Sequence, residues 1–535
     1  MTFFKRLTEF LFFTPELSAQ GRLATQLFAE KSSGLSFAGS CNTANNRECW
    51  SEGFNITTDY EKHVPDGIER EFYLEVDNHE IAPDGYLVQR MLFNGTYPGP
   101  TLEGNWGDTF NADGLVGALK INGPTSMNYD EDLGPVLITD NFHKTAFSQV
   151  QLEYMGRPPA PDSMLMNGNG RYYCCPVGAG CNSDSKCVGG SNITTFNFKR
   201  GSSYKMSLVN TGTSTHTTFW IDHHNFTVVG TDFVPIKPYT ASIINIAIGQ
   251  RYDIIINANA SKNTRTDFWI HARDCQIGGA RSNLGIIRYD PTSTRLPWTP
   301  PVDDRHVCYG CLDESPKDLK PIVPRMVKNA ANEGFEKDSL KVHLVGFPND
   351  FDPDATLHKW VLKDSSLYLD WSQPSLSLVK IASDQGWENP KFPKGYEPVD
   401  LRSYKENSWV YFLIEGKFQE SVDNATHKIY KKQAPVAHPM HIHGHDFVIL
   451  DSGTTEFDPK NYTINRDNPP RRDVALLPVN GGGLALQFIE QPEKLSRQFG
   501  DSGRVDEFSK TCTNWAAYYT MFNKNYNATQ DDSGI

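Results

Sequence analysis

Short stretches of alternating apolar and polar residues recur along the chain, and they constrain its fold more than any other feature. Alternation of this kind is typical of β-strands with one buried side and one solvent-facing side. It occurs in residues 71–76, 204–210, 243–250 and 251–258, and turns rich in Gly, Pro, Asn and Asp separate such stretches. Long helical periodicity is nearly absent. The pattern therefore predicts an all-β protein built from β-sandwiches with Greek-key connections.

The length of the chain predicts more than one hydrophobic core. A chain of 535 residues is expected to form two to four domains. Its net charge of −13 argues against nucleic acid and anionic membrane surfaces as partners. No apolar run is long enough to span a bilayer. We therefore expect neither nucleic acid nor a membrane among the partners.

Histidine is concentrated in one stretch, HPMHIHGHDF at residues 438–447, which holds four of the fifteen histidines. In a β-strand, residues i and i+2 lie on the same face, so His441 and His443 are expected to point into one site and His438 elsewhere. Neutral imidazole binds copper, zinc, iron and nickel. From the spacing alone, a metal site and a His-rich surface loop are both open.

With its apolar flanks, this stretch closely resembles the third copper motif of the multicopper oxidases, and of the laccases in particular. The resemblance implies that His438 binds the mononuclear type 1 copper. It also implies that His441 and His443 enter the trinuclear copper cluster, where dioxygen is reduced, and it gives His445 no ligand role. Further segments are similar to ascomycete-type (fungal) laccases, namely residues 41–60, 94–108, 468–474 and the final four residues, DSGI.

The resemblance implies three cupredoxin-like domains and a secreted, monomeric copper enzyme. Such an enzyme oxidises phenolic or aromatic-amine small molecules and reduces O2 to water. We expect a leader or propeptide-like segment at 1–40, a first domain at 41–150, a second at 151–315 and a third at 316–535. The third domain is expected to end in a tail that plugs the channel to the cluster.

Two segments that carry copper motifs in the family have no counterpart here. In the family, the first domain supplies two H-x-H motifs, and the third supplies an H-C-H motif whose thiolate binds type 1 copper. Here Phe110 runs directly into Asn111, and Asn480 into Gly481, where those motifs would stand. The only H-x-H patterns lie within 441–445, and no cysteine adjoins a histidine. We therefore expect the first and third domains to be incomplete and the chain to be inactive as a laccase.

The second domain is expected to be complete and to bind no copper. The resemblance implies that it helps to form the pocket of the reducing substrate. Asp232 falls near the acidic position that receives a phenolic proton, and a turn or surface aspartate is the alternative. His223 and His224 are expected to be solvated in an exposed turn.

Ten cysteines and eight N-x-[ST] sequons predict a secreted, glycosylated protein with disulfides. The first 40 residues resemble a signal peptide poorly, because Glu9 breaks a short apolar run. One insert holds Cys174, Cys175, Cys181 and Cys187, which fit either two local disulfides or a zinc site.

The resemblance also implies pairings for other cysteines. It pairs Cys41 with Cys49, and Cys275 with Cys308 or Cys311. It implies that the partner of Cys512 lay in the missing part of the first domain.

Four interpretations follow. The chain is a laccase-type oxidase with an incomplete sequence, or an inactive splice variant or decayed paralogue. Alternatively, it is a secreted glycoprotein that binds one copper or zinc ion through His438, His441 and His443, or an unrelated β-protein.

Overall fold

A computed structural model describes most of the chain between residues 41 and 522. The described ranges are 41–111, 117–145, 160–172, 184–189, 192–260, 265–275, 282–298, 311–328, 339–348, 356–362, 372–385, 398–400, 408–416, 419–422, 429–432, 437–453, 464–478, 487–489, 492–503 and 505–522, with the single residues 149, 392 and 404.

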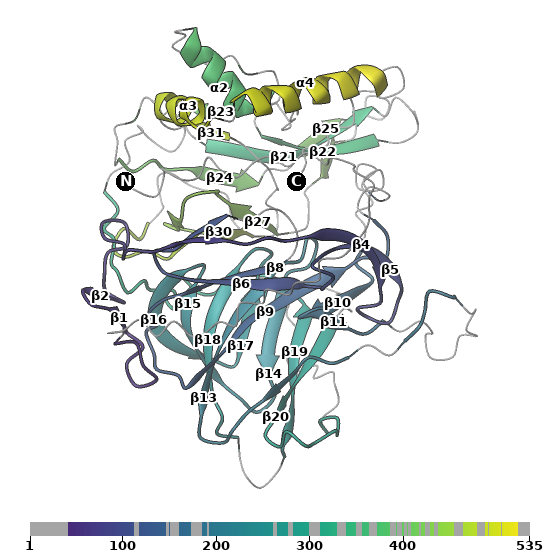
Figure 1. Cartoon of the computed structure of the whole chain (residues 1–535), viewed down its shortest axis with the longest axis vertical. Helices are drawn as coiled ribbons and strands as arrows, with labels where there is room; N and C mark the ends of the chain where they lie inside the picture. Colours follow the sequence, from purple (N-terminus) through teal and green to yellow (C-terminus); the bar gives the residue numbers. More distant parts are fainter. Residues whose placement is uncertain are drawn as a thin grey trace.

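Two large sheets fill the lower part of Figure 1. Together with residues 311–321, which pack against them, they are called the middle domain below. The seven-stranded sheet has the order β11-β10-β9-β13-β18-β15-β16, and the five-stranded sheet has the order β12-β20-β19-β14-β17. The strands of the first sheet are β9 Glu131–Asn141, β10 Ser163–Met166, β11 Asn169–Gly170, β13 Ser203–Asn210, β15 Phe226–Thr231, β16 Val234–Ala241 and β18 Arg251–Asn257. Those of the second are β12 Thr195–Asn197, β14 Thr217–Ile221, β17 Ile243–Ile246, β19 Asp267–Asp274 and β20 Ser282–Arg288.

Apolar side chains from both sheets share one core, which explains why these strands form. Val136, Met206 and Ile254 come from the seven-stranded sheet, and Phe219 and Ile270 from the five-stranded sheet. All five residues of β14 are buried, as expected for a strand inside the sandwich. β9 belongs to this sheet, because β10 and β13 pair with it, although it lies in the range expected for the first domain. The division at residue 150 stays a prediction.

The hairpin β15–β16 closes with two residues in left-handed conformations. Asp232 has φ 45° and Phe233 has φ 69°, and Thr231 pairs with Val234. Two such residues form the turn that matches the twist of antiparallel strands, and Asp adopts this conformation more readily than most residues. The turn directs Asp232 inward, where it is 2% exposed, whereas Phe233 is 67% exposed.

Described residues between 41 and 122 form strand pairs, drawn in purple to blue, most of which cross the middle of Figure 1. Each sheet here has two strands among the described residues. Large apolar residues remain exposed on them, Met91 to 55% and Leu119 to 46%. β7 spans the junction of Phe110 with Asn111, and residues 112–116 lie outside the described ranges. The bounds are β1 Cys49–Ser51, β2 Phe54–Asn55, β3 Glu69–Glu71, β4 Val76–Ile81, β5 Val88–Phe93, β6 Gly99–Asn105, β7 Thr109–Asn111 and β8 Gly117–Asn122.

Among its described residues, the C-terminal part combines small sheets with three helices, which lie at the top of Figure 1. β21, β22 and β24 form one sheet, and β27–β30, β28–β29, β23–β31 and β25–β26 form pairs. The bounds are β21 Ser339–Pro348, β22 Thr356–Leu362, β23 Pro398–Asp400, β24 Leu413–Gly416, β25 Gln419–Val422, β26 Ile429–Lys432, β27 His438–His441, β28 Phe447–Val448, β29 Arg471–Arg472, β30 Val474–Leu477, β31 Gln487–Ile489, α2 Ser375–Asp384, α3 Pro492–Asp501 and α4 Val505–Phe522. The junction of Asn480 with Gly481 and the C-terminal tail lie outside the described residues.

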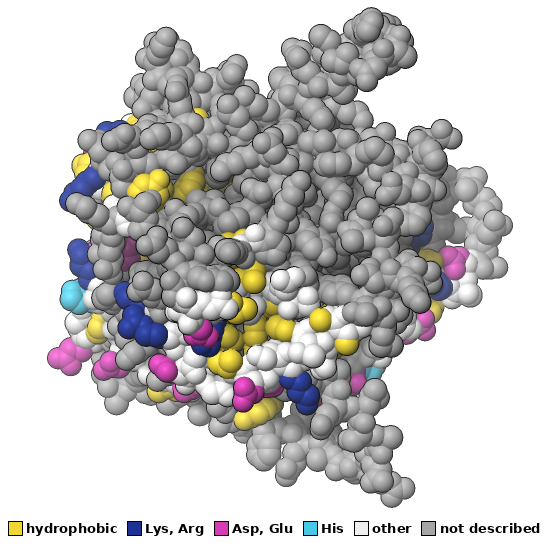
Figure 2. Space-filling model, turned by 90° about the horizontal axis from the view of Figure 1, so that it is seen from above, with side chains coloured by type: hydrophobic (Ala, Val, Ile, Leu, Met, Phe, Trp, Pro, Cys, Tyr) yellow, Lys and Arg dark blue, Asp and Glu magenta, His cyan; other side chains and the backbone are white. Residues whose placement is uncertain are grey.

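The mostly-β prediction is confirmed, but the sequence analysis did not predict α4, which is 18 residues long. In Figure 2, seen from the end that carries the helices, the basic and acidic side chains that are drawn in colour are interspersed. Within the described part of the chain, no helix is long and apolar enough to cross a membrane.

Candidate metal centre

His441 and His443 lie side by side at the end of β27. The strand ends at His441, and His443 follows in a turn, so the expected strand does not continue through both. Their ring centroids are nevertheless 5.0 Å apart, with 51° between the ring planes, and both residues are exposed. Two imidazoles at this spacing on the surface can approach one ion, so the predicted shared site is geometrically possible.

The ring of His441 has a defined hydrogen-bond partner. Its Nδ1 lies 2.8 Å from the carbonyl oxygen of Asp473. A carbonyl can only accept, so Nδ1 carries the proton and donates. In the neutral ring, Nε2 then keeps its lone pair, which is the form that binds metals. Any metal bound by His441 would therefore bind at Nε2.

His438 lies on the other face of β27 from His441, because three positions separate them. Burial, together with the nearby His216, lowers the pKa of His438 to about 4. The ring is therefore neutral over most of the pH range. The structure thus separates His438 from the pair formed by His441 and His443.

His216, from the middle domain, was not singled out in the sequence. It is 3% exposed, and burial lowers its pKa. Its Nε2 donates to the carbonyl of Ala437 at 3.1 Å, and the N–H of Ile248 donates to its Nδ1 at 3.1 Å. Because Ala437 directly precedes β27, His216 attaches the start of the histidine stretch to the middle domain.

These residues fit one partial copper site and do not fit the full set of the family. Imidazole is a good copper ligand, and His441 and His443 offer two. Among the described residues, no group of three or more His, Cys, Asp or Glu side chains is placed to hold a metal. A type 1 site needs a thiolate, and a trinuclear cluster needs more imidazoles than two.

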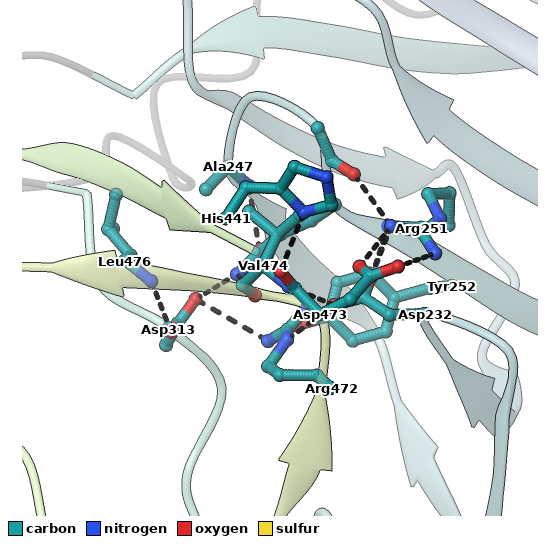
Figure 3. Close-up of polar contacts among 12 residues, drawn as sticks. Asp232, Ala247, Arg251, Tyr252, Asp313, His441, Arg472, Asp473, Val474 and Leu476 are labelled. Carbon is teal, nitrogen blue, oxygen red and sulfur yellow. Dashed lines mark hydrogen bonds and ion pairs between the residues drawn. The ribbon is translucent and has the colours of Figure 1, made fainter. Parts of the chain in front are cut away.

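Polar side chains of the middle domain bind β30, the strand that pairs with β27 (Figure 3). Gln250 donates to the carbonyl of Val474 at 3.2 Å, and the N–H of Leu476 donates to Asp313 at 2.8 Å. Gln250 and Asp313 are themselves linked at 2.5 Å. The histidine strand is therefore connected to the middle domain through its own strand partner.

Asp232 belongs to this interface. Its carboxylate accepts from Arg472 Nε at 2.7 Å, from the N–H of Arg251 at 2.8 Å and from the N–H of Val474 at 3.3 Å. The side chains of Asp232 and Arg472 are both fully buried. Tyr252 lies beside Arg472, with its hydroxyl 3.2 Å from the guanidinium, and burial raises the pKa of Tyr252. Asp232 thus lies at the interface, where its carboxylate accepts hydrogen bonds from three donor groups.

A second ionic cluster surrounds the other end of the histidine stretch. Arg471 pairs with Asp446 at 2.6 Å and also with Glu61, and Tyr60 donates to Asp446 at 3.3 Å. Arg325 forms a bidentate pair with Asp59, and this pair holds the pKa of Asp59 well below its usual range. The N-terminal segment is thereby fixed against the end of the stretch.

His224 corrects an expectation from the sequence. It is 4% exposed rather than solvated, whereas His223 is exposed. Its Nδ1 donates to the carbonyl of Asp222 at 2.7 Å, and its Nε2 lies 2.7 Å from the hydroxyl of Tyr289. The local sequence could not predict this burial, because Tyr289, which contacts His224, lies 65 positions further along the chain.

The cysteine pairings agree with the resemblance where they are described. Cys41 bonds to Cys49, and Cys275 bonds to Cys311 rather than Cys308. Cys187 is disulfide-bonded, which favours local disulfides over zinc in the insert. Cys174, Cys175 and Cys181 lie outside the described residues, and Cys512 carries a reduced thiol in α4.

The fold and the sequence place the chain in a known class. Multicopper oxidase family models match residues 132–292 and 368–493. The chain is similar to oxidoreductase tpcJ of Aspergillus fumigatus, at 36% identity over 92% of this chain and 95% of that protein. It is also similar to Laccase-2 of Botryotinia fuckeliana, at 31% identity over 93% and 94%. The crystal structure of a laccase from Botrytis aclada aligns with a TM-score of 0.74 at 29% identity, over 93% of this chain and 100% of that one.

These likenesses define a cupredoxin-like, laccase-type protein. The chain belongs to the multicopper oxidase family. The alignment with tpcJ extends over 598 positions, whereas the chain has 535 residues, so at least 63 positions face gaps in this chain. The relatives therefore carry residues with no counterpart here.

Proposed function

We propose that this chain is by origin a laccase-type oxidoreductase of phenolic or aromatic-amine small molecules, with O2 as the oxidant. In the form given by this sequence, it binds one copper ion at His441 and His443 and does not complete the laccase reaction. The adjacency of these two rings carries the proposal. In His441, Nδ1 donates a hydrogen bond to the Asp473 carbonyl, so Nε2 is the nitrogen that remains to bind the metal.

The reaction requires more than this site provides. A laccase takes electrons from the substrate at a copper bound by thiolate and delivers four electrons to dioxygen at three neighbouring coppers. Two imidazoles cannot hold such a cluster. No cysteine in the sequence adjoins a histidine, so the direct route from thiolate to cluster is missing.

The role of proton acceptor, which the resemblance implies for Asp232, stays a prediction. Both carboxylate oxygens already accept hydrogen bonds from the protein. A substrate hydroxyl would have to reach a side chain that is fully buried. These contacts favour the structural alternative for Asp232.

Secretion is part of the proposal. The disulfides Cys41–Cys49 and Cys275–Cys311 support it, because structural disulfides persist in oxidising compartments. Small phenols and O2 are the expected partners, and a monomer is the expected state.

Copper titration of the purified chain tests the proposed site. Calorimetry should detect one weakly bound Cu(II) in the parent, and a His441→Ala, His443→Ala double variant should lose it. His445→Ala is the matched control, because His445 is exposed in the same stretch but has no ligand role. The parent should show no intense blue absorption and no oxygen uptake with a phenol. Several tightly bound coppers, or a blue protein, would contradict the proposal.

The gaps in the alignment favour a second candidate, in which a longer transcript of the same gene encodes an active laccase. Sequencing the transcript across residues 110–111 and 480–481 tests it. Inserted H-x-H and H-C-H coding segments at these junctions would establish an incomplete sequence. Uninterrupted junctions would establish a splice variant or decayed paralogue.

A further inference from the structure

We propose that Asp473 is a positioning residue for His441, and that Arg251 of the middle domain holds Asp473 in place. Through its carbonyl oxygen, Asp473 fixes the tautomer of His441, so that Nε2 faces the metal. This inference rests on the copper site proposed above, and nothing in the sequence pattern points to it.

The pairing of β27 with β30 is the first step. His441 pairs with Val474, Met440 with Ala475, and Pro439 with Leu476. The polar backbone groups of Val474 and Leu476 bind side chains of the middle domain. In an antiparallel pair, hydrogen-bonded and non-hydrogen-bonded residue pairs alternate. The hydrogen bonds to β27 are therefore expected from Ala475 and Leu477, which pair with Met440 and His438. Pro439, which has no N–H, therefore stands opposite a position that needs none.

The outer edge of β30 is thus occupied by side chains in place of a strand. Asp232 accepts from the N–H of Val474, Gln250 donates to its carbonyl, and Asp313 accepts from the N–H of Leu476. The middle domain therefore sets the position of β30 along its length.

Asp473 lies in the bend between β29 and β30, and its side chain links this bend to Arg251 of the middle domain. Arg251 binds its two carboxylate oxygens at 2.5 and 2.7 Å. The same guanidinium donates to the carbonyl of Gly249 at 3.1 Å and lies 4.5 Å from the ring centre of Phe233. The Arg251 guanidinium is therefore held by two groups of its own domain, the Gly249 carbonyl and the Phe233 ring, and in turn fixes Asp473.

The position of the Asp473 carbonyl determines which ring nitrogen of His441 carries the proton. With Nδ1 of His441 at 2.8 Å, the Nδ1–H tautomer donates to the carbonyl. The other tautomer would direct a ring lone pair at the carbonyl oxygen. Partners of this kind orient metal-binding histidines and raise their basicity. Displacing Asp473 should therefore change the tautomer of His441 before any metal is added.

Nitrogen NMR of the metal-free, ¹⁵N-histidine-labelled chain measures this directly. The His441 signals are assigned with a His441→Ala variant, at a pH where the ring is neutral. The parent should show Nδ1–H. Arg251→Gln should show a mixture of both tautomers, and Asp473→Asn breaks the same pair from the other side. Arg288→Gln is the matched control, because it removes an Arg–Asp pair of 2.6 Å between two neighbouring strands of the five-stranded sheet, β19 and β20.

Copper affinity is the second measurement. It should fall about tenfold in Arg251→Gln, as is typical when a partner of a metal ligand is lost, and stay at the parent value in Arg288→Gln. If both variants at the pair keep the parental tautomer and fold by circular dichroism, or if the parent shows Nε2–H, the inference is wrong. If the tautomer changes but the parent binds no copper at the two histidines, the copper site fails and the positioning role stands.

Discussion

Asp232 and Arg472 place opposite charges where neither side chain is exposed to solvent. Removing one partner of a buried pair leaves an uncompensated charge, which typically costs about 3–5 kcal/mol. We therefore predict that Asp232→Ala lowers the free energy of unfolding by about this amount. Urea denaturation followed by circular dichroism is the measurement.

A double variant separates the pair from its surroundings. Asp232→Ala with Arg472→Met should cost less than the two single changes added together, because no charge is then left buried. Unchanged stability in Asp232→Ala would contradict the structural role and favour that of proton acceptor.

His224 predicts a pH dependence of the middle domain. Burial lowers its pKa below the ordinary value of 6.5, so the unfolded chain binds a proton more readily than the folded one. Stability should therefore fall as the pH drops below about 6.5, with a slope of up to about 1.4 kcal/mol per pH unit from this residue. His224→Gln should reduce the slope but not abolish it, because His216 is also buried.

Denaturation between pH 5 and 7 measures this slope, with fluorescence of the buried Trp220 and Trp269 as the signal. His63→Gln, at an exposed position, is the control. An equal slope in His224→Gln and the parent would show that another group dominates.

At the scale of elements, the sequence predicted strands of the middle domain but not the long C-terminal helix. The alternating stretches 204–210 and 251–258 correspond to β13 and β18, because period-two patterns reflect a local geometry. The strand expected at 71–76 is wrong, because residues 72–75 only connect the end of β3 to the start of β4. The whole of α4 was missed, since its 18 residues mix apolar and polar side chains with little separation into faces.

The candidate site divides in the same way. The histidine stretch was recognisable, because its candidate ligands lie within a few residues of one another. Its supports were not, because Gln250, Asp313 and Asp473 come from three distant segments that only the fold brings together. The inward direction of Asp232 depends on a two-residue turn and on Arg472, 240 positions away.

At the scale of the molecule, the middle domain differs from its neighbours. Its sheets have seven and five strands around one large core, whereas sheets elsewhere in the described residues have two or three strands. Isolated two-stranded pairs are marginally stable. We therefore expect regions outside the middle domain to open more readily.

Limited proteolysis tests this expectation. A protease should cut the segments on either side of the middle domain early and leave a resistant fragment that begins near β9 and ends near Leu319, the last residue of the core. Mass spectrometry identifies its ends. Equal resistance along residues 41–522 would show that the segments on either side are as stable as the middle domain.

The side chains along the outer edge of β30 also bear on solubility. An unpaired strand edge offers N–H and C=O groups to which a strand of another molecule can add, and this is a common beginning of aggregation. Asp232, Gln250 and Asp313 already satisfy those groups, and two of the three are acidic. They therefore exclude a foreign strand from β30. Relatives of this chain that replace these side chains with apolar ones would need another covering at the same edge to avoid aggregation at high concentration.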